Sequence, residues 1–205
     1  MGVIADSFQK EGARVTGIDP NPEVIKEAKK YNLCTFLVQD GTNLQFTDSS
    51  FDTIIINDVL EHVPYNQASE LLREAKRVMN VNGIMYVSIM NRWQIQEPHC
   101  RIPFLTWLPR SSWNITYSIL MRTRKRYTDN YFPYTKQQFL DLAREVGLKS
   151  SDYTSDYGRE KITHPEQIGS KSIRLIVKIL TKMRLQPQLI DLSERFSVLT
   201  FICTI

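Results

Sequence analysis

The fold of this 205-residue chain is decided by R-V-T-G-I-D-P-N-P (residues 14–22), Q-D-G-T-N-L-Q-F (39–46) and S-F-D-T-I-I-I-N-D-V-L-E-H-V (50–63). Each segment contains or follows an apolar, β-branched run, and the runs stop at Asp19, Asp40 and Asn57. Short runs of this kind predict buried strands, and parallel sheets bind their ligands at the carboxyl ends of the strands. Three such ends in succession indicate a pocket for a nucleotide-like ligand.

Strands and helices are expected to alternate on both sides of these segments. We expect strands at 14–19, 35–39, 51–57 and 84–90, and helices at 3–12, 22–31 and 67–78. The run at 51–57 predicts a central strand buried on both faces, and Asn82-Gly83 predicts a turn before the next strand. A helix at 137–147 and strands at 148–153 and 196–205 complete the pattern, which is that of a doubly wound α/β sheet.

Length and composition are those of a single globular domain, 1–205, with two insertions. Residues 91–134 are rich in Trp, Pro and Arg and predict loops with a short helix, while residues 160–190 contain a basic amphipathic helix at 169–185. The whole chain has a formal net charge of +4, and eleven Lys and Arg residues lie in two stretches without acidic residues, 98–128 and 167–190. The remainder therefore carries about −7.

Cysteine usage and hydropathy indicate where the chain acts. Its three cysteines, Cys34, Cys100 and Cys203, are far apart and show no metal-binding spacing, which indicates a reducing compartment. No apolar run is long enough to span a bilayer, and no signal peptide is recognisable. We expect a cytoplasmic protein, with membrane association as an alternative.

Three segments together resemble class I S-adenosylmethionine-dependent methyltransferases. They are D-G-T-N-L-Q-F, S-S-F-D-T-I-I-I-N-D-V-L-E-H-V and L-R-E-A-K-R-V-M-N-V-N-G-I-M-Y-V-S-I (72–89). The resemblance implies a Rossmann-like fold, S-adenosylmethionine as cofactor, and methyl transfer to an oxygen, nitrogen or carbon atom of a small or amphiphilic acceptor. It also implies that Asp40 and Gly41 receive the adenine and that the backbone of Asn57 faces the methionine moiety.

Asp19, followed by Pro20, has more than one interpretation. A carboxylate at this strand end can accept two hydrogen bonds from a ribose diol, but enzymes that use NAD employ the same device. A helix cap or a solvated loop residue is the structural alternative. An NAD-dependent oxidoreductase is therefore a second enzymatic hypothesis. This hypothesis does not explain the sequences of segments 40–41 and 57–62.

The beginning of the chain departs from the family pattern. The family's first strand and glycine-rich G-x-G-x-G loop precede the first helix, whereas here Met1-Gly2-Val3 leads directly into it. We expect an N-terminally truncated domain in which Gly2 ends that loop. Loss of a central strand would leave backbone groups of both neighbours without partners. A non-catalytic binding or scaffold protein is therefore the alternative function.

Asp58, Glu61 and His62 are expected on one helical turn at the mouth of the pocket, for which three roles compete. They can orient the loop after the strand, or His62 can act as a base toward an acceptor hydroxyl or amine. The trio also resembles the E-x-x-E-H metal-binding segment of some related methyltransferases, but Asp58 replaces the first glutamate, and we assign no metal. His99 is a second candidate base.

The two insertions are expected to face the methyl acceptor. Aromatic residues of 91–134 can form a lid over a small-molecule or lipid-like acceptor, or simply pack the insertion onto the sheet: Trp93, Phe104, Trp107, Trp113 and Tyr117. The basic helix at 169–185 can cover the sheet, contact an anionic membrane peripherally or hold an amphiphilic substrate. Its cations do not alternate with a stacking platform, which argues against nucleic acid as a partner.

Overall fold

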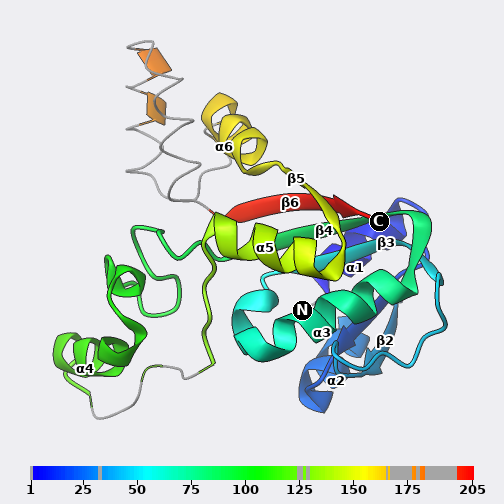
Figure 1. The fold of residues 1–205 in the computed structure, drawn as a ribbon, viewed down its shortest axis with the longest axis horizontal. Helices are drawn as coiled ribbons and strands as arrows, with labels where there is room; N and C mark the ends of the chain where they lie inside the picture. The colour runs from blue at the N-terminus through cyan, green and yellow to red at the C-terminus, as the bar shows by residue number, and fades with distance from the viewer. Residues whose placement is uncertain are drawn as a thin grey trace.

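A computed structural model gives the structure of residues 2–31, 34–123, 127, 130–164, 166, 177–178, 181–182 and 198–205 (Figure 1). The first half contains α1 (Val3–Lys10), β1 (Thr16–Asp19), α2 (Pro22–Tyr31), β2 (Thr35–Val38), β3 (Phe51–Asn57), the 3-10 helix η1 (Leu60–His62), α3 (Tyr65–Val78) and β4 (Met79–Ile89). The second half contains the 3-10 helix η2 (Leu105–Trp107), α4 (Arg110–Leu120), α5 (Lys136–Val146), β5 (Lys149–Asp152), α6 (Thr154–Thr163) and β6 (Leu199–Thr204).

The strands form two sheets among the described residues. β1 and β2 make a parallel pair, and a second sheet has the order β3-β4-β6-β5. β3 and β4 run parallel, whereas β6 is antiparallel to both of its neighbours. The expected α/β architecture with parallel strands is confirmed, and the antiparallel β6 follows the parallel part of the sheet.

Helices α3 and α5 lie side by side over the larger sheet (Figure 1). The main core lies between them and the strands, where the rings of Phe139 on α5 and Phe201 on β6 stack with centroids 4.2 Å apart. A separate small cluster joins α2 to β2 through Ile25, Ala28 and Phe36. Burial of the apolar stripe of each helix against a strand is what fixes these layers.

Local signals for helix ends are confirmed at several positions. The side chain of Asn21 accepts a hydrogen bond from the N–H of Glu23 (2.9 Å) and Pro22 is the first residue of α2, as predicted. Thr135 and Gln138 form a reciprocal capping box at the start of α5. Gly147 ends α5 with φ 75°, a left-handed conformation that glycine adopts without strain.

Two predictions about the middle strands are wrong. β3 is not buried on both faces, because it is the outer strand of its sheet and only Ile56 in it is buried. Asn82-Gly83 does not precede the next strand but lies inside β4, where the pairing with β3 shifts register. A Cβ at Gly83 would lie 2.7 Å from Met79 Cγ and 2.9 Å from the Asn80 carbonyl oxygen, so the close approach of the backbone requires glycine.

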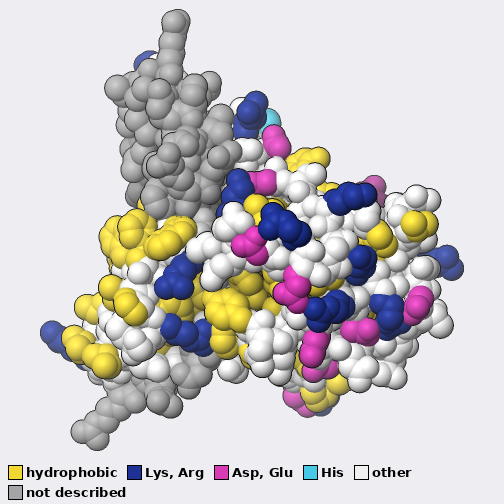
Figure 2. Space-filling model, in the orientation of Figure 1, with side chains coloured by type: hydrophobic (Ala, Val, Ile, Leu, Met, Phe, Trp, Pro, Cys, Tyr) yellow, Lys and Arg dark blue, Asp and Glu magenta, His cyan; other side chains and the backbone are white. Residues whose placement is uncertain are grey.

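Residues 91–134 leave the larger sheet between β4 and α5 and form their own small core, which contains Ile102, Leu105 and Trp113. A bridge between Asn91 and Tyr134 closes the base of this insertion. Its outer surface is rich in exposed apolar side chains (Figure 2). The short helix expected in the insertion is α4.

The helix expected at 169–185 lies outside the described residues, apart from 177–178 and 181–182. In the part of the chain that the structure describes, we find no helix with the length and apolar character needed to cross a bilayer.

Candidate functional site

Asp19 and Asp40 lie at the same edge of the β1–β2 sheet. Asp19 pairs with Val38 in parallel register, and the N–H of Gln39 donates to the Asp19 carbonyl (3.2 Å), so Asp40 follows directly. The Asp19 carboxylate accepts the N–H of Asn21 (2.8 Å), and the Asp40 carboxylate accepts the N–H and the hydroxyl of Thr42 (both 2.9 Å). These bonds use one oxygen of each carboxylate, and the second oxygen of each makes no hydrogen bond to described residues.

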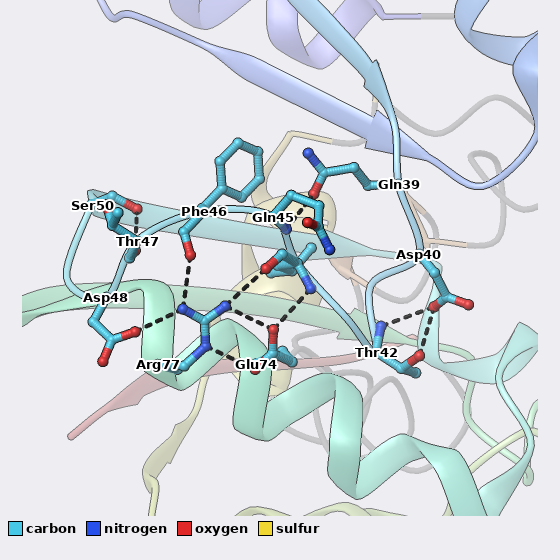
Figure 3. A network of polar contacts seen from close by, with 11 residues as sticks. Gln39, Asp40, Thr42, Gln45, Phe46, Thr47, Asp48, Ser50, Glu74 and Arg77 are labelled. Atoms are coloured by element: carbon cyan, nitrogen blue, oxygen red, sulfur yellow. Dashed lines mark hydrogen bonds and ion pairs between the residues drawn. The ribbon is translucent and has the colours of Figure 1, made fainter.

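The loop after β2 is fixed to α3 by a polar network (Figure 3). The guanidinium of Arg77 donates to the carbonyls of Leu44 (3.0 Å) and Phe46 (2.8 Å) and to the carboxylates of Asp48 (2.7 Å) and Glu74 (2.8 Å). Glu74 also accepts the N–H of Leu44 (2.8 Å), and its hydrogen bond with Arg77 lowers the pKa of Glu74 below the usual value. The loop that carries Asp40 therefore has a defined position relative to the larger sheet.

Gly41 also contacts α3. A Cβ at this position would lie 3.1 Å from Cδ1 of Leu71, so the glycine allows the loop to approach the helix closely. The predicted approach of an adenine ring to Gly41 stays a prediction.

Asn57 stands at the carboxyl end of β3, opposite Ser88 of β4. Its side-chain amide donates to Asp58 (2.9 Å), and the other carboxylate oxygen of Asp58 accepts the hydroxyl of Ser88 (2.9 Å). These bonds hold the chain in a sharp turn, in which Asp58 adopts a left-handed conformation with φ 53°. The backbone of Asn57 therefore ends the strand in a fixed geometry.

Gly2 and Pro20 occupy positions next to these strand ends in the sequence. Gly2 is the N-terminal cap residue of α1 with φ 75°, and its carbonyl accepts the N–H of Asp6 (2.9 Å). Pro20 is exposed between β1 and α2. No contact between either residue and a ligand follows from this geometry alone, so both stay predicted cofactor residues.

The prediction of one helical turn from Asp58 to His62 is wrong. Asp58 precedes the helical residues in a left-handed conformation, and η1 covers only Leu60–His62. Asp58 and His62 are exposed, whereas Glu61 is buried with 1% exposure. The described residues include no group of three or more His, Cys, Asp or Glu side chains arranged to hold a metal ion.

Glu61 is an unusual buried carboxyl group. Neither of its side-chain oxygens has a hydrogen-bond partner among the described residues, although its backbone carbonyl accepts the N–H of Phe132 (2.6 Å). Burial is the largest cause that raises the pKa of Glu61 to about 7; the nearby Asp58 adds to it, while the backbone amides of Glu61 and Met90 partly oppose it. Glu61 therefore holds a proton at mildly acidic pH, unlike an exposed glutamate.

The structure brings His62 and His99 together from segments 37 positions apart. Their ring centroids are 5.7 Å apart in an edge-to-face arrangement, and both rings pack near Tyr131, at 6.2 Å for His62 and 5.1 Å for His99. His62 Nδ1 lies 3.3 Å from the Asn130 carbonyl oxygen. The two predicted bases thus form one imidazole pair where the insertion meets the turn after β3.

Glu97 is the site residue that sequence reasoning missed. Its side chain is fully buried and its carboxylate lies 2.6 Å from His99 Nδ1. The spacing Glu97-x-His99 was an available signal, because residues two apart in a turn can bond to each other.

A hollow of about 350 Å³ lies near the amino-terminal ends of the parallel strands β3 and β4. It is lined by Arg73, Arg77, Met79 and Val81 among others. Met79 pairs with Phe51 at the start of the parallel strands. Ligands of parallel sheets bind at the carboxyl ends of the strands, so this hollow is not the candidate site.

Comparison with known proteins agrees with the strand-end geometry. Residues 1–87, less than half of the chain, match the family model described as a methyltransferase domain. The match covers β1 to most of β4 and therefore includes Asp19, Asp40 and Asn57.

Relatives of the methyltransferase domain include two proteins named ubiquinone biosynthesis O-methyltransferase. The protein from Xanthomonas oryzae is 31% identical over 97 residues, which cover 44% of this chain and 40% of that protein. The protein from Pasteurella multocida is 31% identical over 106 residues, 44% of this chain and 43% of that protein. The chain thus matches about two fifths of the length of these curated relatives.

Solved structures show the fold beyond the methyltransferase domain. A SAM-dependent methyltransferase from Archaeoglobus fulgidus superposes with a TM-score of 0.59 at 13% identity, covering 100% of this chain and 81% of that one. A 1,6-didemethyltoxoflavin-N1-methyltransferase from Burkholderia thailandensis superposes with a TM-score of 0.53 at 13% identity, covering 98% of this chain and 65% of that one. The chain has the Rossmann-like fold of class I methyltransferases.

Proposed function

We propose that this protein transfers a methyl group from S-adenosylmethionine to an oxygen atom of a small or amphiphilic acceptor. The observation that carries the proposal is the placement of Asp19 and Asp40 at one edge of two adjacent parallel strands, each with a carboxylate oxygen left for a ligand. The family of residues 1–87 supports the methyl donor, and the names of the O-methyltransferase relatives support an oxygen acceptor.

The residues of the strand ends would divide the cofactor between them. Asp19, beside Pro20, would accept hydrogen bonds from the ribose diol, and Asp40 with Gly41 would receive the adenine amino group. The backbone of Asn57, and Gly2 with its left-handed conformation, would face the amino acid moiety. When bound, S-adenosylmethionine supplies an electrophilic methyl group. The protein then needs mainly to orient the acceptor, since well-oriented reactants can account for about 7–11 kcal/mol of a barrier.

The cofactor assignment can be tested by calorimetry with S-adenosylhomocysteine. Asp19→Asn should weaken binding about tenfold or more, because a hydrogen bond to a charged group contributes roughly 1.5–3 kcal/mol. Asp156→Asn, an exposed acidic position on α6, is the matched control and should bind as the wild type does. Equal affinity of all three proteins would contradict the role of Asp19, and binding of NAD instead would favour an oxidoreductase.

A non-catalytic binding protein is the alternative. Among the described residues, the outer edges of β1 and β3 have no partner strand, and the strands form two separate sheets instead of one continuous sheet. Binding of S-adenosylhomocysteine without turnover of any acceptor would favour this alternative.

We further propose that the insertion at 91–134 contacts an amphiphilic acceptor or the anionic membrane surface that contains it. α4 exposes Ile115 (64%), Ile119 (68%) and Leu120 (59%). Arg101 and Arg122 are exposed in the same acid-free stretch. Apolar side chains beside cations are the composition that binds to anionic interfaces.

Co-sedimentation with vesicles tests this surface. The protein should bind anionic vesicles more tightly than neutral ones, and the double variant Ile115→Ser/Ile119→Ser should lose most of that binding. Val81→Ser, at an equally exposed valine of β4 (71%), is the matched control. Retention of binding by the double variant would contradict the proposal.

A further inference from the structure

Glu97 is held rigidly in the interior of the insertion. Its side chain has 0% exposure, and its carboxylate accepts the backbone N–H of Cys100 (2.5 Å) as well as contacting His99 Nδ1 (2.6 Å). Its backbone is also fixed, because the N–H of Glu97 donates to the Ile102 carbonyl (3.2 Å) and its own carbonyl accepts the N–H of Arg101 (2.8 Å). The carboxylate therefore has one orientation relative to His99.

The charge state of Glu97 determines what it can do. Burial opposes its ionisation, but hydrogen bonds, first among them that from the Cys100 amide, outweigh burial and lower the pKa of Glu97 below the usual value. An ionised carboxylate only accepts hydrogen bonds. The proton of the neutral imidazole must then reside on Nδ1 of His99, which leaves the lone pair on Nε2.

The imidazole of His99 is also confined by aromatic neighbours. Tyr131 packs edge-to-face against it at 5.1 Å, and Tyr131 is itself buried and receives a hydrogen bond from Gln94 (3.0 Å). The His62 ring packs against it at 5.7 Å. The side chain of His99 nevertheless keeps 45% exposure, and its Nε2 has no hydrogen-bond partner among the described residues. The ring is thus contacted by Glu97, Tyr131 and His62, whereas Nε2 makes no hydrogen bond to the described residues.

The position of the pair fits an acceptor site. His62 follows Asn57, the end of β3, by five residues, and its Nδ1 lies near the Asn130 carbonyl (3.3 Å). The N–H of Phe132 donates to the Glu61 carbonyl (2.6 Å) in the same region. These contacts fasten the end of the insertion to the turn after β3. His99 therefore packs against His62, five residues beyond the end of β3, which is one of the strand ends proposed to hold the methyl donor.

We propose that Glu97 is a positioning residue, which fixes His99 in the Nδ1–H tautomer so that Nε2 serves as the base for an acceptor hydroxyl group. This inference rests on the proposed methyl transfer. In the step, Nε2 takes the hydroxyl proton, the acceptor oxygen bonds to the methyl carbon, and the carbon–sulfur bond breaks with its electron pair moving to sulfur. The products are the methyl ether and S-adenosylhomocysteine, and the imidazolium returns its proton to water.

The tautomer can be measured without any substrate by ¹⁵N NMR of the imidazole groups at pH 8. The chain has only three histidines, so each can be assigned. His99 should be in the Nδ1–H form in the wild type and should shift toward the Nε2–H form in Glu97→Gln, because the amide can donate to Nδ1. A wild-type His99 in the Nε2–H form would overturn the inference, whether or not the variant folds.

His164 provides an internal control with the same spacing. Its Nδ1 lies 3.2 Å from the Glu166 carboxylate, but His164 and Glu166 have 57% and 67% of their side chains exposed. Water competes for an exposed pair, so His164 should show a mixture of tautomers that Glu97→Gln does not change. The same shift at both histidines would indicate a global change and would overturn the specific role of Glu97.

The catalytic part is tested with catechol as the acceptor. His99→Gln should lower kcat about 100-fold or more, as expected for loss of a general base, and Glu97→Gln should lower kcat about tenfold with little change in KM. Both variants should bind S-adenosylhomocysteine as the wild type does, and His164→Gln should keep full activity. Unchanged kcat in His99→Gln would overturn the base. Failure of the wild type to bind S-adenosylhomocysteine would instead refute the proposed function and leave the tautomer result intact.

Discussion

Replacing Glu61 with glutamine should stabilise the protein at pH 8 and change its stability little at pH 4.5. The carboxyl group has 1% exposure and no side-chain hydrogen bond among the described residues, and burial raises its pKa from the usual 4.5 to about 7. This difference corresponds to about 3 kcal/mol between the protonated and ionised folded protein. Glutamine has nearly the same shape and never ionises, so it avoids that cost.

The direction of the pH dependence follows from proton binding. Between pH 4.5 and about 7 the folded protein keeps the Glu61 proton while the unfolded chain has lost it, so the free energy of unfolding falls as the pH rises. Above pH 7 both states are ionised at Glu61 and its contribution becomes constant. Glu74, Glu97 and Asp152 have lowered pKa values, so their contributions change below the usual carboxyl pKa and do not overlap this window.

Urea unfolding followed by circular dichroism at pH 4.5, 6, 7 and 8 measures the effect. The wild type should lose about 3 kcal/mol across this range relative to Glu61→Gln, whose curve should be flatter. Glu70→Gln, at an exposed position on α3, is the control and should follow the wild type. Parallel curves for the wild type and Glu61→Gln would refute the argument that Glu61 is buried as a neutral acid.

Gly83→Ala should destabilise the protein by about 1–3 kcal/mol, read as a lower Tm, because the new Cβ would overlap the backbone of Asn80 and Asp52. A Tm within one degree of the wild type would contradict the close approach. Arg77→Gln should release the loop that carries Asp40 and speed amide exchange at 42–48 at least tenfold, while exchange in β4 should stay unchanged. Thr135→Ala removes one half of the capping box and should cost about 1 kcal/mol of unfolding free energy in urea titrations, an effect that Ser111→Ala, at an exposed position on α4, should not reproduce.

Sequence reasoning predicted the elements whose signals are local. Asn21-Pro22 at the start of α2, Gly147 at the end of α5 and the carboxylates that follow β1 and β2 all lie where expected. Each of these depends on a few neighbouring residues, either through a cap or through the polarity change at a strand end. The confirmed α/β fold follows from the order of such elements.

Features that depend on distant neighbours were not predicted. An apolar run such as Phe51–Asn57 has the same sequence in a central or an outer strand, because burial depends on which strands flank it. The contact of His62 with His99 requires the insertion to fold back through Asn130 and Phe132, which no spacing in the sequence reveals. Glu97 was recognisable only as a residue two positions from a histidine.

The outer edge of β3 has a consequence for handling the protein in solution. Along that edge no described strand satisfies the backbone N–H and C=O groups, and the strand also exposes Ile55. A row of unpaired backbone groups beside apolar side chains is a template on which any extended polypeptide can add a further strand. Concentrated samples should therefore self-associate through this edge, and a short β-forming peptide supplied in excess should compete with that association and keep the protein monomeric.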